Sequence, residues 1–181
     1  DGLIRATVFD HFCGGINEMD CLSVVDKMYT KGVSSVLDYS VEGKEEEAQF
    51  DAALEMTLKT IEFAKERQAI PFAVFKPTGL GRLDLYTKVG EKQSLSAEEQ
   101  SEWNKVKERF ELVCKTAHQK DVALLIDAEE SWMQDAADDL VEEMMRKYNK
   151  EKVIVFSTLQ MYRWDRLDYL KGLHEKAKVD G

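Results

Sequence analysis

The sequence has little proline, little cysteine and no long apolar run. Only 2 of its 181 residues are proline, so this residue seldom interrupts helices or strands. The three cysteines, Cys13, Cys21 and Cys114, form no Cys-x-x-Cys pair, which argues against a zinc site and for a reducing compartment. The longest apolar runs, such as residues 123–126, are far shorter than the about 20 residues of a membrane-spanning helix. We therefore expect a cytoplasmic globular chain that does not cross a membrane.

Positive charge is also scarce. The chain has 25 Lys and Arg against 35 Asp and Glu, a formal net charge of −10. Binding to a nucleic-acid backbone needs a clustered basic face, so we expect no nucleic-acid partner. One domain holds about 100–200 residues, and with 44% hydrophobic residues the chain can form one sizeable core. We treat residues 1–181 as a single domain.

Apolar runs that end in polar residues predict four buried parallel strands. The strands are expected over residues 35–41, 72–76, 123–127 and 153–158. Helical spacing of apolar residues predicts helices over 19–31 and 44–67, two pieces between the second and third strands, and one after each later strand. Ser96 and Glu99 form a capping box before one of these pieces. The predicted order is a leading helix and four βα units, as in a doubly wound sheet or a βα barrel.

In parallel βα folds, ligands bind at the carboxyl ends of the strands. Lys76 and Asp127 close two apolar strands there, and each charge needs a partner. Either the two side chains pair with each other as a strut between strands, or they face a ligand. Gly79 and Gly81 are more typical of a turn than of a phosphate loop, because a third glycine is missing.

Other reactive residues favour no further site. Glu129 and Glu130 follow Asp127, but without a second acidic cluster we assign no metal. The three histidines lie outside the strand ends, and none pairs with a Ser or Cys nucleophile, which argues against triad chemistry. These residues are His11, His118 and His174.

Five segments in this order resemble the proline dehydrogenase (proline oxidase) family. They are Phe-Cys-Gly-Gly at 12–15, Leu-Asp-Tyr-Ser-Val-Glu-Gly at 37–43, Phe-Lys-Pro-Thr-Gly-Leu-Gly at 75–81, Leu-Ile-Asp-Ala-Glu-Glu at 125–130 and Thr-Leu-Gln-Met-Tyr at 158–162. The resemblance implies a distorted (βα)8 TIM-type barrel that binds FAD. It further implies oxidation of L-proline to Δ1-pyrroline-5-carboxylate, with hydride transfer to the flavin and electron transfer to a membrane quinone.

The resemblance also implies roles for three residues. Lys76 resembles the family's second-strand lysine, which helps bind the substrate carboxylate. Asp127 resembles the third-strand aspartate beside flavin and substrate, and Gln160 the fourth-strand glutamine that hydrogen-bonds the flavin ring. The quinone acceptor implies peripheral contact with the inner membrane, which is the mitochondrial one in a eukaryote.

The chain departs from the family pattern in two ways. Ile16 stands where the family usually has Glu after the glycine pair, and Gly181 comes before the family's fifth strand. A (βα)8 barrel takes about 250 residues, so we expect the N-terminal half of the barrel, truncated before strand five. Open strand edges and an exposed inner face then predict self-association. We also expect this piece to be inactive alone and to bind FAD weakly at best.

Two alternatives stay open from the residues. Lys76 could form a Schiff base at a strand end, as in barrel aldolases. The chain could also be a non-enzymatic half-barrel that serves as an assembly module.

Overall fold

Three parallel strands form the sheet of this computed structural model, which describes residues 5–9, 13–38 and 45–180. The strands are β1 (Phe72–Phe75), β2 (Ala123–Ile126) and β3 (Val155–Ser157), in the order β1-β2-β3. Three of the four predicted strands are thus confirmed. The expected strand over residues 35–41 contributes one parallel bridge, between Leu37 and Ala73, and residues 39–41 lie outside the described residues.

The helices follow the predicted order. They are α3 (Glu18–Tyr29), α4 (Glu47–Lys65), α5 (Leu83–Gly90), α6 (Ala97–Lys120), α7 (Gln134–Tyr148) and α8 (Arg166–Asp180). A short π-helix, η1 (Arg5–Phe9), and a short 3₁₀ helix, η2 (Pro77–Gly79), accompany them. The predicted capping box at α6 is confirmed: Ser96 Oγ accepts from the Glu99 N–H, and the Glu99 carboxylate accepts from the Ser96 N–H. Asn17 caps α3 in a similar way, by accepting from two backbone N–H groups.

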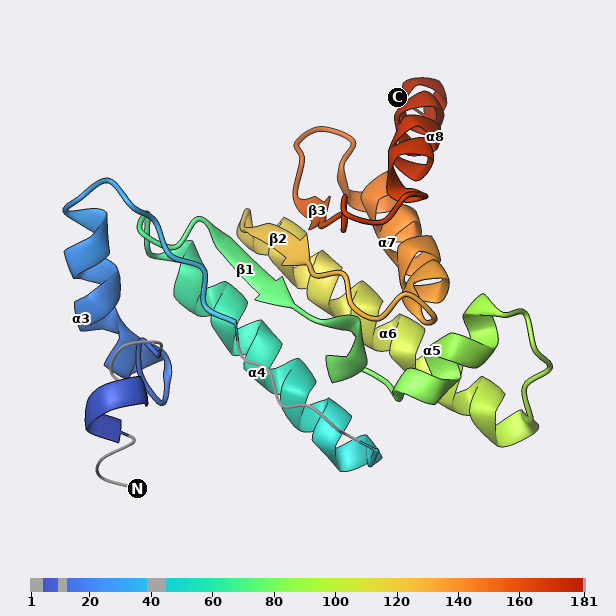
Figure 1. Ribbon diagram of the computed structural model, residues 1–181, viewed down its shortest axis with the longest axis horizontal. Coiled ribbons are helices and arrows are strands. Elements are labelled where there is room, and N and C mark those ends of the chain that lie inside the picture. Colours follow the sequence, from blue (N-terminus) through green and yellow to red (C-terminus); the bar gives the residue numbers. More distant parts are fainter. Residues whose placement is uncertain (1–4, 10–12, 39–44, 181) are drawn as a thin grey trace.

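A layer of helices covers one face of the sheet. Helix α4 packs on β1, α6 on β2 and α7 on β3, and neighbouring helices touch one another, whereas α3 lies apart from this layer (Figure 1). Leu124 and Ile126 of β2 are buried in this interface, and Phe75 packs edge-on against Phe110 at 5.2 Å between ring centroids. The burial of this apolar face is the main stabilising contribution to the fold.

The strand order bears on the two expected architectures. Consecutive strands are neighbours, and right-handed crossovers then place all connecting helices on one face. A doubly wound sheet carries helices on both faces, so the arrangement agrees with a segment of a βα barrel. The described strands form an open three-stranded sheet. The fold is therefore α/β with a small parallel sheet.

The second face of the sheet is apolar and less covered. Phe72, Leu125 and Phe156 are half-buried on it, and Val74 is buried. Phe72 and Phe156 meet edge-on at 5.2 Å between ring centroids, across the intervening strand. This second face forms the floor beneath the strand-end residues.

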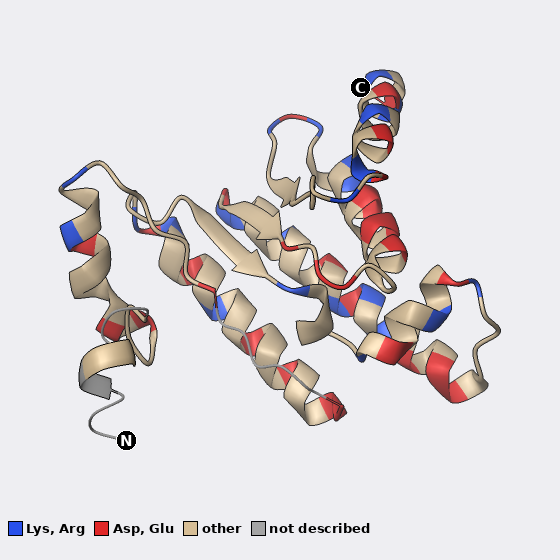
Figure 2. Ribbon diagram, viewed as in Figure 1, with Lys and Arg blue, Asp and Glu red and all other residues tan. Residues whose placement is uncertain are grey.

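Charges of both signs are interspersed along the helices. Figure 2 shows acidic and basic segments alternating on α6 and α8. Among the described residues, no helix combines the length and the apolar character needed to cross a membrane.

Gly81 explains how the turn after β1 reaches the helix layer. A Cβ at this position would come within 2.4 Å of a Val106 methyl group, whereas a Cβ at Gly79 would meet nothing within 4 Å. Gly81 therefore permits close packing of the turn against α6. This packing supports the interpretation of the two glycines as a turn.

Candidate functional site

The carboxyl ends of the three strands are in register. Phe75 pairs with Ile126, which pairs with Ser157, so Lys76, Asp127 and Thr158 are the next residues on each strand. The ladder continues through them, because the Asp127 N–H donates to the Phe75 carbonyl at 3.0 Å and the Thr158 N–H to the Ile126 carbonyl at 3.1 Å.

Side chains alternate between the two faces of a strand. Lys76, Asp127 and Thr158 each stand two residues after a member of the second face, namely Val74, Leu125 and Phe156. The three polar groups therefore form a rim above that apolar floor.

Lys76 is paired with Asp38. Its Nζ lies 2.7 Å from Asp38 Oδ2, and the side chains are 30% and 37% exposed. This hydrogen bond raises the pKa of Lys76 against the opposing effect of burial, and the charges of Asp127 and Glu129 raise it further. Of the two alternatives, the strut between Lys76 and Asp127 is therefore not formed. The partner of Lys76 comes instead from the segment of residues 35–38, in which Leu37 bridges to Ala73 of β1.

Asp127 uses one carboxylate oxygen to join two strand ends. Its Oδ1 accepts from the Thr158 hydroxyl at 2.9 Å and from the Ala128 N–H at 3.1 Å. Oδ2 has no hydrogen-bond partner among the described residues. Asp127 is thus held in place while one oxygen stays available to a ligand.

Gln160 reaches back from β3 to the loop after β2. Its Nε2 donates to the Glu129 carbonyl at 2.9 Å, with a longer contact to the Ala128 carbonyl at 3.4 Å. Within the described ranges the Oε1 atom has no partner, so the amide presents an acceptor. The structure therefore gathers Lys76, Asp127 and Gln160 around the end of β2, although it does not test the roles predicted for them.

A contact between Thr78 and Glu129 was not foreseen from the sequence. The Thr78 N–H donates to Glu129 Oε2 at 2.8 Å and its hydroxyl donates to Oε1 at 2.6 Å. Burial raises the pKa of Glu129, while these two hydrogen bonds oppose the rise. The sequence offered only one indication of this contact, the acidic residue two positions after Asp127 in the loop that follows β2.

A series of buried hydrogen bonds joins α7 to α8, and the sequence analysis did not predict it. The Gln134 amide accepts from the Glu129 N–H at 2.8 Å and donates to Asp138 at 2.8 Å, and Arg166 donates to Asp138 at 2.6 Å. All three side chains are buried. The sequence did hold an indication of these bonds. Asp138 lies three residues before the buried Val141, and a carboxylate on the core-facing side of α7 needs a partner.

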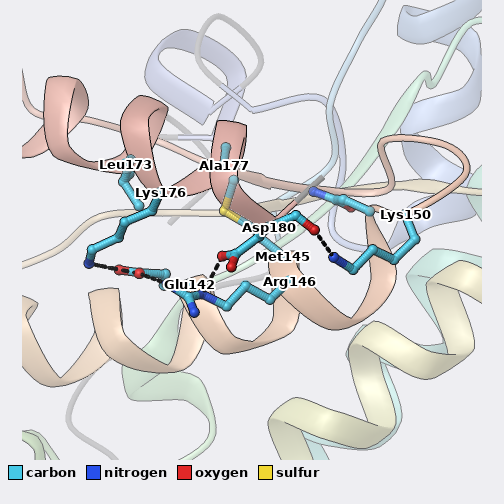
Figure 3. A pocket seen from close by; sticks show the side chains of 9 residues that line it. Glu142, Met145, Arg146, Lys150, Leu173, Lys176, Ala177 and Asp180 are labelled. Atoms are coloured by element: carbon cyan, nitrogen blue, oxygen red, sulfur yellow. Dashed lines mark hydrogen bonds and ion pairs between the residues drawn. The ribbon is translucent and has the colours of Figure 1, made fainter.

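A groove lies between α7 and α8 (Figure 3). Its charged residues pair with one another: Glu142 contacts Arg146 and Lys176 at 2.8 Å, and Arg146 contacts Asp180 at 3.2 Å. Because these charges pair with one another, the groove is a packing contact between α7 and α8. Within the part of the chain that the structure describes, no three His, Cys, Asp or Glu side chains group as a metal site.

Comparison with known proteins identifies the family. A family model described as "Proline dehydrogenase" matches residues 21–181. The chain belongs to the proline dehydrogenase family. The family expected from the sequence is thereby confirmed.

The curated relatives of this chain are longer than the chain itself. The carbapenem antibiotics biosynthesis protein CarD of Pectobacterium carotovorum subsp. carotovorum is 34% identical over 99% of the chain and 48% of CarD. Proline dehydrogenase 1, mitochondrial, of Dictyostelium discoideum is 26% identical over 93% of the chain and 36% of that protein. The chain thus spans about half or less of the length of these relatives.

Solved structures agree on the fold. Proline utilization A (PutA) from Bdellovibrio bacteriovorus, inactivated by N-propargylglycine, matches with a TM-score of 0.79 at 16% identity, over 99% of this chain and 20% of that one. PutA from Corynebacterium freiburgense matches with a TM-score of 0.71 at 17% identity, over 98% of this chain and 17% of that one. At such identities the likeness concerns the fold alone.

Proposed function

We propose that this chain contributes the first half of a proline dehydrogenase active site, which oxidises L-proline to Δ1-pyrroline-5-carboxylate in proline catabolism. The observation that carries the proposal is the gathering of Lys76, Asp127 and Gln160 around the end of β2 in a member of this family. The reaction removes a hydride from the ring carbon next to nitrogen and a proton from the nitrogen.

The strand ends have the features that a flavin ring requires. The half-buried floor of Leu125 and Phe156 offers an apolar surface to a flat ring, and the polar rim offers groups to its edge. Gln160 Oε1 is available to accept from a ring N–H, and Asp127 Oδ2 is a second acceptor at the end of the neighbouring strand. When bound, FAD supplies the hydride acceptor and passes the electrons to a quinone.

Lys76 is the group suited to the substrate carboxylate. Asp38 occupies one of the three donor directions of its ammonium, and the raised pKa keeps the group charged at neutral pH. A point charge held at the rim can meet an anionic ligand. Asp127 and Asp38 flank this charge, and Asp127 Oδ2 offers an acceptor to the substrate ammonium.

The same protonation state argues against a Schiff-base function. A nucleophilic lysine needs a lowered pKa so that the neutral amine is populated. The hydrogen bond from Lys76 to Asp38 has the opposite effect. A purely structural half-barrel is also not favoured, because an assembly module has no need of a charged rim above an apolar floor.

The test is anaerobic addition of L-proline in the presence of excess FAD. It is applied to the isolated chain and to the longest gene product that carries these 181 residues. We expect bleaching of the flavin absorbance in the longer product, and an isolated chain that purifies colourless, binds FAD weakly and is inactive. Asp127→Asn keeps the Oδ1 acceptor and removes the charge, so this variant should fold normally and bleach more slowly. An unreduced flavin in a longer product that retains FAD would overturn the proposal.

CarD supports a second use of the same oxidation. Its name assigns that relative to carbapenem biosynthesis, and its 34% identity exceeds the 26% of the Dictyostelium enzyme. We therefore consider oxidation of proline for a biosynthetic product as the second candidate. Growth on proline as the nitrogen source, compared before and after deletion of the gene, distinguishes the catabolic role from the biosynthetic one.

The partial barrel and self-association belong to the same proposal. Among the described residues, β3 pairs only with β2 and leaves one edge without a partner strand. Completion of a (βα)8 barrel would cover this edge and the second face together. In the isolated chain we propose that a second copy covers them. For the full enzyme we propose a cytoplasmic location with peripheral contact at the quinone-bearing inner membrane, the mitochondrial one in a eukaryote.

A further inference from the structure

Thr78 and Glu129 come from different βα loops, 51 residues apart in sequence, and meet through two hydrogen bonds. The backbone N–H and the hydroxyl of one residue engage both oxygens of one carboxylate, so neither side chain can rotate without breaking a bond. The contact is partly buried, where a lost hydrogen bond to a charged group is costly. Such a two-point contact sets the position of one loop relative to the other.

The loop after β1 is held from its other side as well. The hydroxyl of the fully buried Tyr86 donates to the Pro77 carbonyl at 2.9 Å. Pro77 lies between Lys76 and Thr78, so both neighbours of this residue are affected by its position. The backbone next to Lys76 is therefore held by hydrogen bonds on two sides, from α5 and from the loop after β2.

Glu129 is also connected to Gln160 and α7. Its carbonyl accepts from Gln160 Nε2 at 2.9 Å, and its N–H donates to the Gln134 amide at 2.8 Å. One residue thus contacts the loop after β1 through its carboxylate, the β3–α8 segment through its carbonyl and α7 through its N–H. Movement of Glu129 would move the Gln160 amide directly.

We propose that Thr78 and Glu129 form a positioning pair that fixes the Lys76 ammonium and the Gln160 amide relative to each other. This inference rests on the proposed function for its purpose, because Lys76 and Gln160 are the groups assigned to substrate and flavin. Its physical content, the coupling of two loops, is independent of turnover. Neither Thr78 nor Glu129 is assigned contact with substrate or cofactor.

The experiment uses nuclear magnetic resonance on the full 181-residue chain labelled with ¹⁵N. The probes are the side-chain NH₂ pair of Gln160 and the ¹⁵Nζ signal of Lys76. In Thr78→Val, which keeps the shape and removes the hydroxyl, we expect both signals to shift. Exchange of the Gln160 amide protons with water should accelerate about 2- to 12-fold, the protection expected from one net hydrogen bond.

Two further variants provide the controls. Thr78→Ser keeps the hydroxyl and should restore both signals. Thr116→Val removes a hydroxyl that bonds the Leu112 carbonyl on the outside of α6 and should leave both signals unchanged. A melting temperature lowered in Thr78→Val with neither probe altered would reduce the pair to a structural contact and overturn the inference.

Glu129→Gln keeps the measurement decisive if Thr78→Val does not fold. It retains one acceptor for Thr78 and removes the other, so an intermediate shift of the Gln160 probe supports the inference and an unchanged Gln160 probe contradicts it. Only the Gln160 probe is used in this variant, because loss of the Glu129 charge acts on Lys76 directly. Because these readouts need neither flavin nor proline, absence of proline oxidation would count against the proposed function alone. If oxidation is detected, Thr78→Val should slow it and Thr78→Ser should retain it.

Discussion

Lys76 is surrounded by negative charge. Asp38 contacts it at 2.7 Å, and Asp127 and Glu129 act on it through space. The pair with Asp38 is about one-third exposed, and exposed ion pairs contribute about 0–1 kcal/mol to stability. Because Lys76 adds this little to stability, it can be changed without unfolding the protein. The effect of such a change on ligand binding can then be measured apart from its effect on the fold.

We therefore predict that Lys76→Met lowers proline affinity and leaves the fold intact. Loss of one charge-assisted hydrogen bond, about 1.5–3 kcal/mol, corresponds to about a 10- to 150-fold weaker affinity. Thermal melts and steady-state kinetics on the longest gene product measure the two effects side by side. An unchanged Michaelis constant and turnover number together with a lowered melting temperature would show that Lys76 is only structural.

Glu129 predicts a pH dependence of stability. Burial raises its pKa above the ordinary value of 4.5, with Glu130 acting in the same direction and Thr78 and Lys76 opposing. Between 4.5 and the raised pKa the folded state binds more protons at Glu129 than the unfolded state, so its contribution to stability falls as the pH rises through this window. Tyr86 also interacts with Glu129, and it titrates far above this window because burial raises its pKa.

Glu129→Gln cannot titrate and should lack this loss. We predict that the free energy of unfolding of the variant, relative to that of the wild type, increases as the pH rises from 4.5 and then levels off above the raised pKa. Urea titrations at a series of pH values measure this difference. A difference that stays constant across the window would mean that the Glu129 pKa is the same in both states.

Helix α8 is attached to the rest of the molecule mainly through polar contacts. Of the described residues of α8, only Arg166 is buried. It is the last member of the series of hydrogen bonds that runs from Glu129 through Gln134 and Asp138. Further along, Lys176 and Asp180 pair with α7. The helix that follows Gln160 is thus anchored at its start by one buried ion pair.

Removal of one member of that pair should be costly. We predict that Asp138→Ala destabilises the protein by about 3 kcal/mol, the low end of the range for an orphaned buried charge, because Asp165 still contacts Arg166 at 2.6 Å. Denaturant unfolding monitored by circular dichroism provides the measurement. The double variant Asp138→Ala, Arg166→Met should recover most of the loss, because neither charge then stays buried alone. A double variant as unstable as the single one would contradict this explanation.

The whole molecule has an uneven surface. One face of the sheet is covered by α4, α6 and α7, whereas the second face holds half-buried aromatic residues and β3 has an open edge in the described chain. Exposed apolar surface and open edges both favour association. The net charge of −10 opposes it, since like-charged copies repel at low ionic strength.

We predict that the isolated chain self-associates and that added salt strengthens the association. Sedimentation velocity over a range of protein and salt concentrations measures both effects. Val153, 54% exposed beside the start of β3, provides the test position, because Val153→Lys places an edge-blocking charge there and should weaken association. Leu112→Lys, at a 43% exposed position on α6, is the matched control and should have no effect. A chain that stays monomeric at all concentrations contradicts the prediction.

The sequence by itself determined the strand and helix order, the capping of α6 and the family. Each of these depends on residues close together in the chain: the apolar runs of β1 and β2, the Ser96–Glu99 spacing and the five ordered segments. Burial of one face makes apolar residues recur at a regular spacing along a strand or helix, and a short stretch of sequence is enough to show this spacing. The spacing does not reveal which polar side chains will meet.

Only the tertiary structure decided the pairing of the polar groups. Lys76 pairs with Asp38, 38 residues away, and Thr78 with Glu129, 51 residues away. Strand register and the approach of the loops determine these partners, whereas spacing alone suggested Asp127 as the partner of Lys76. A buried or half-buried charge needs a partner. Which residue becomes that partner depends on which loops the packed helices bring together.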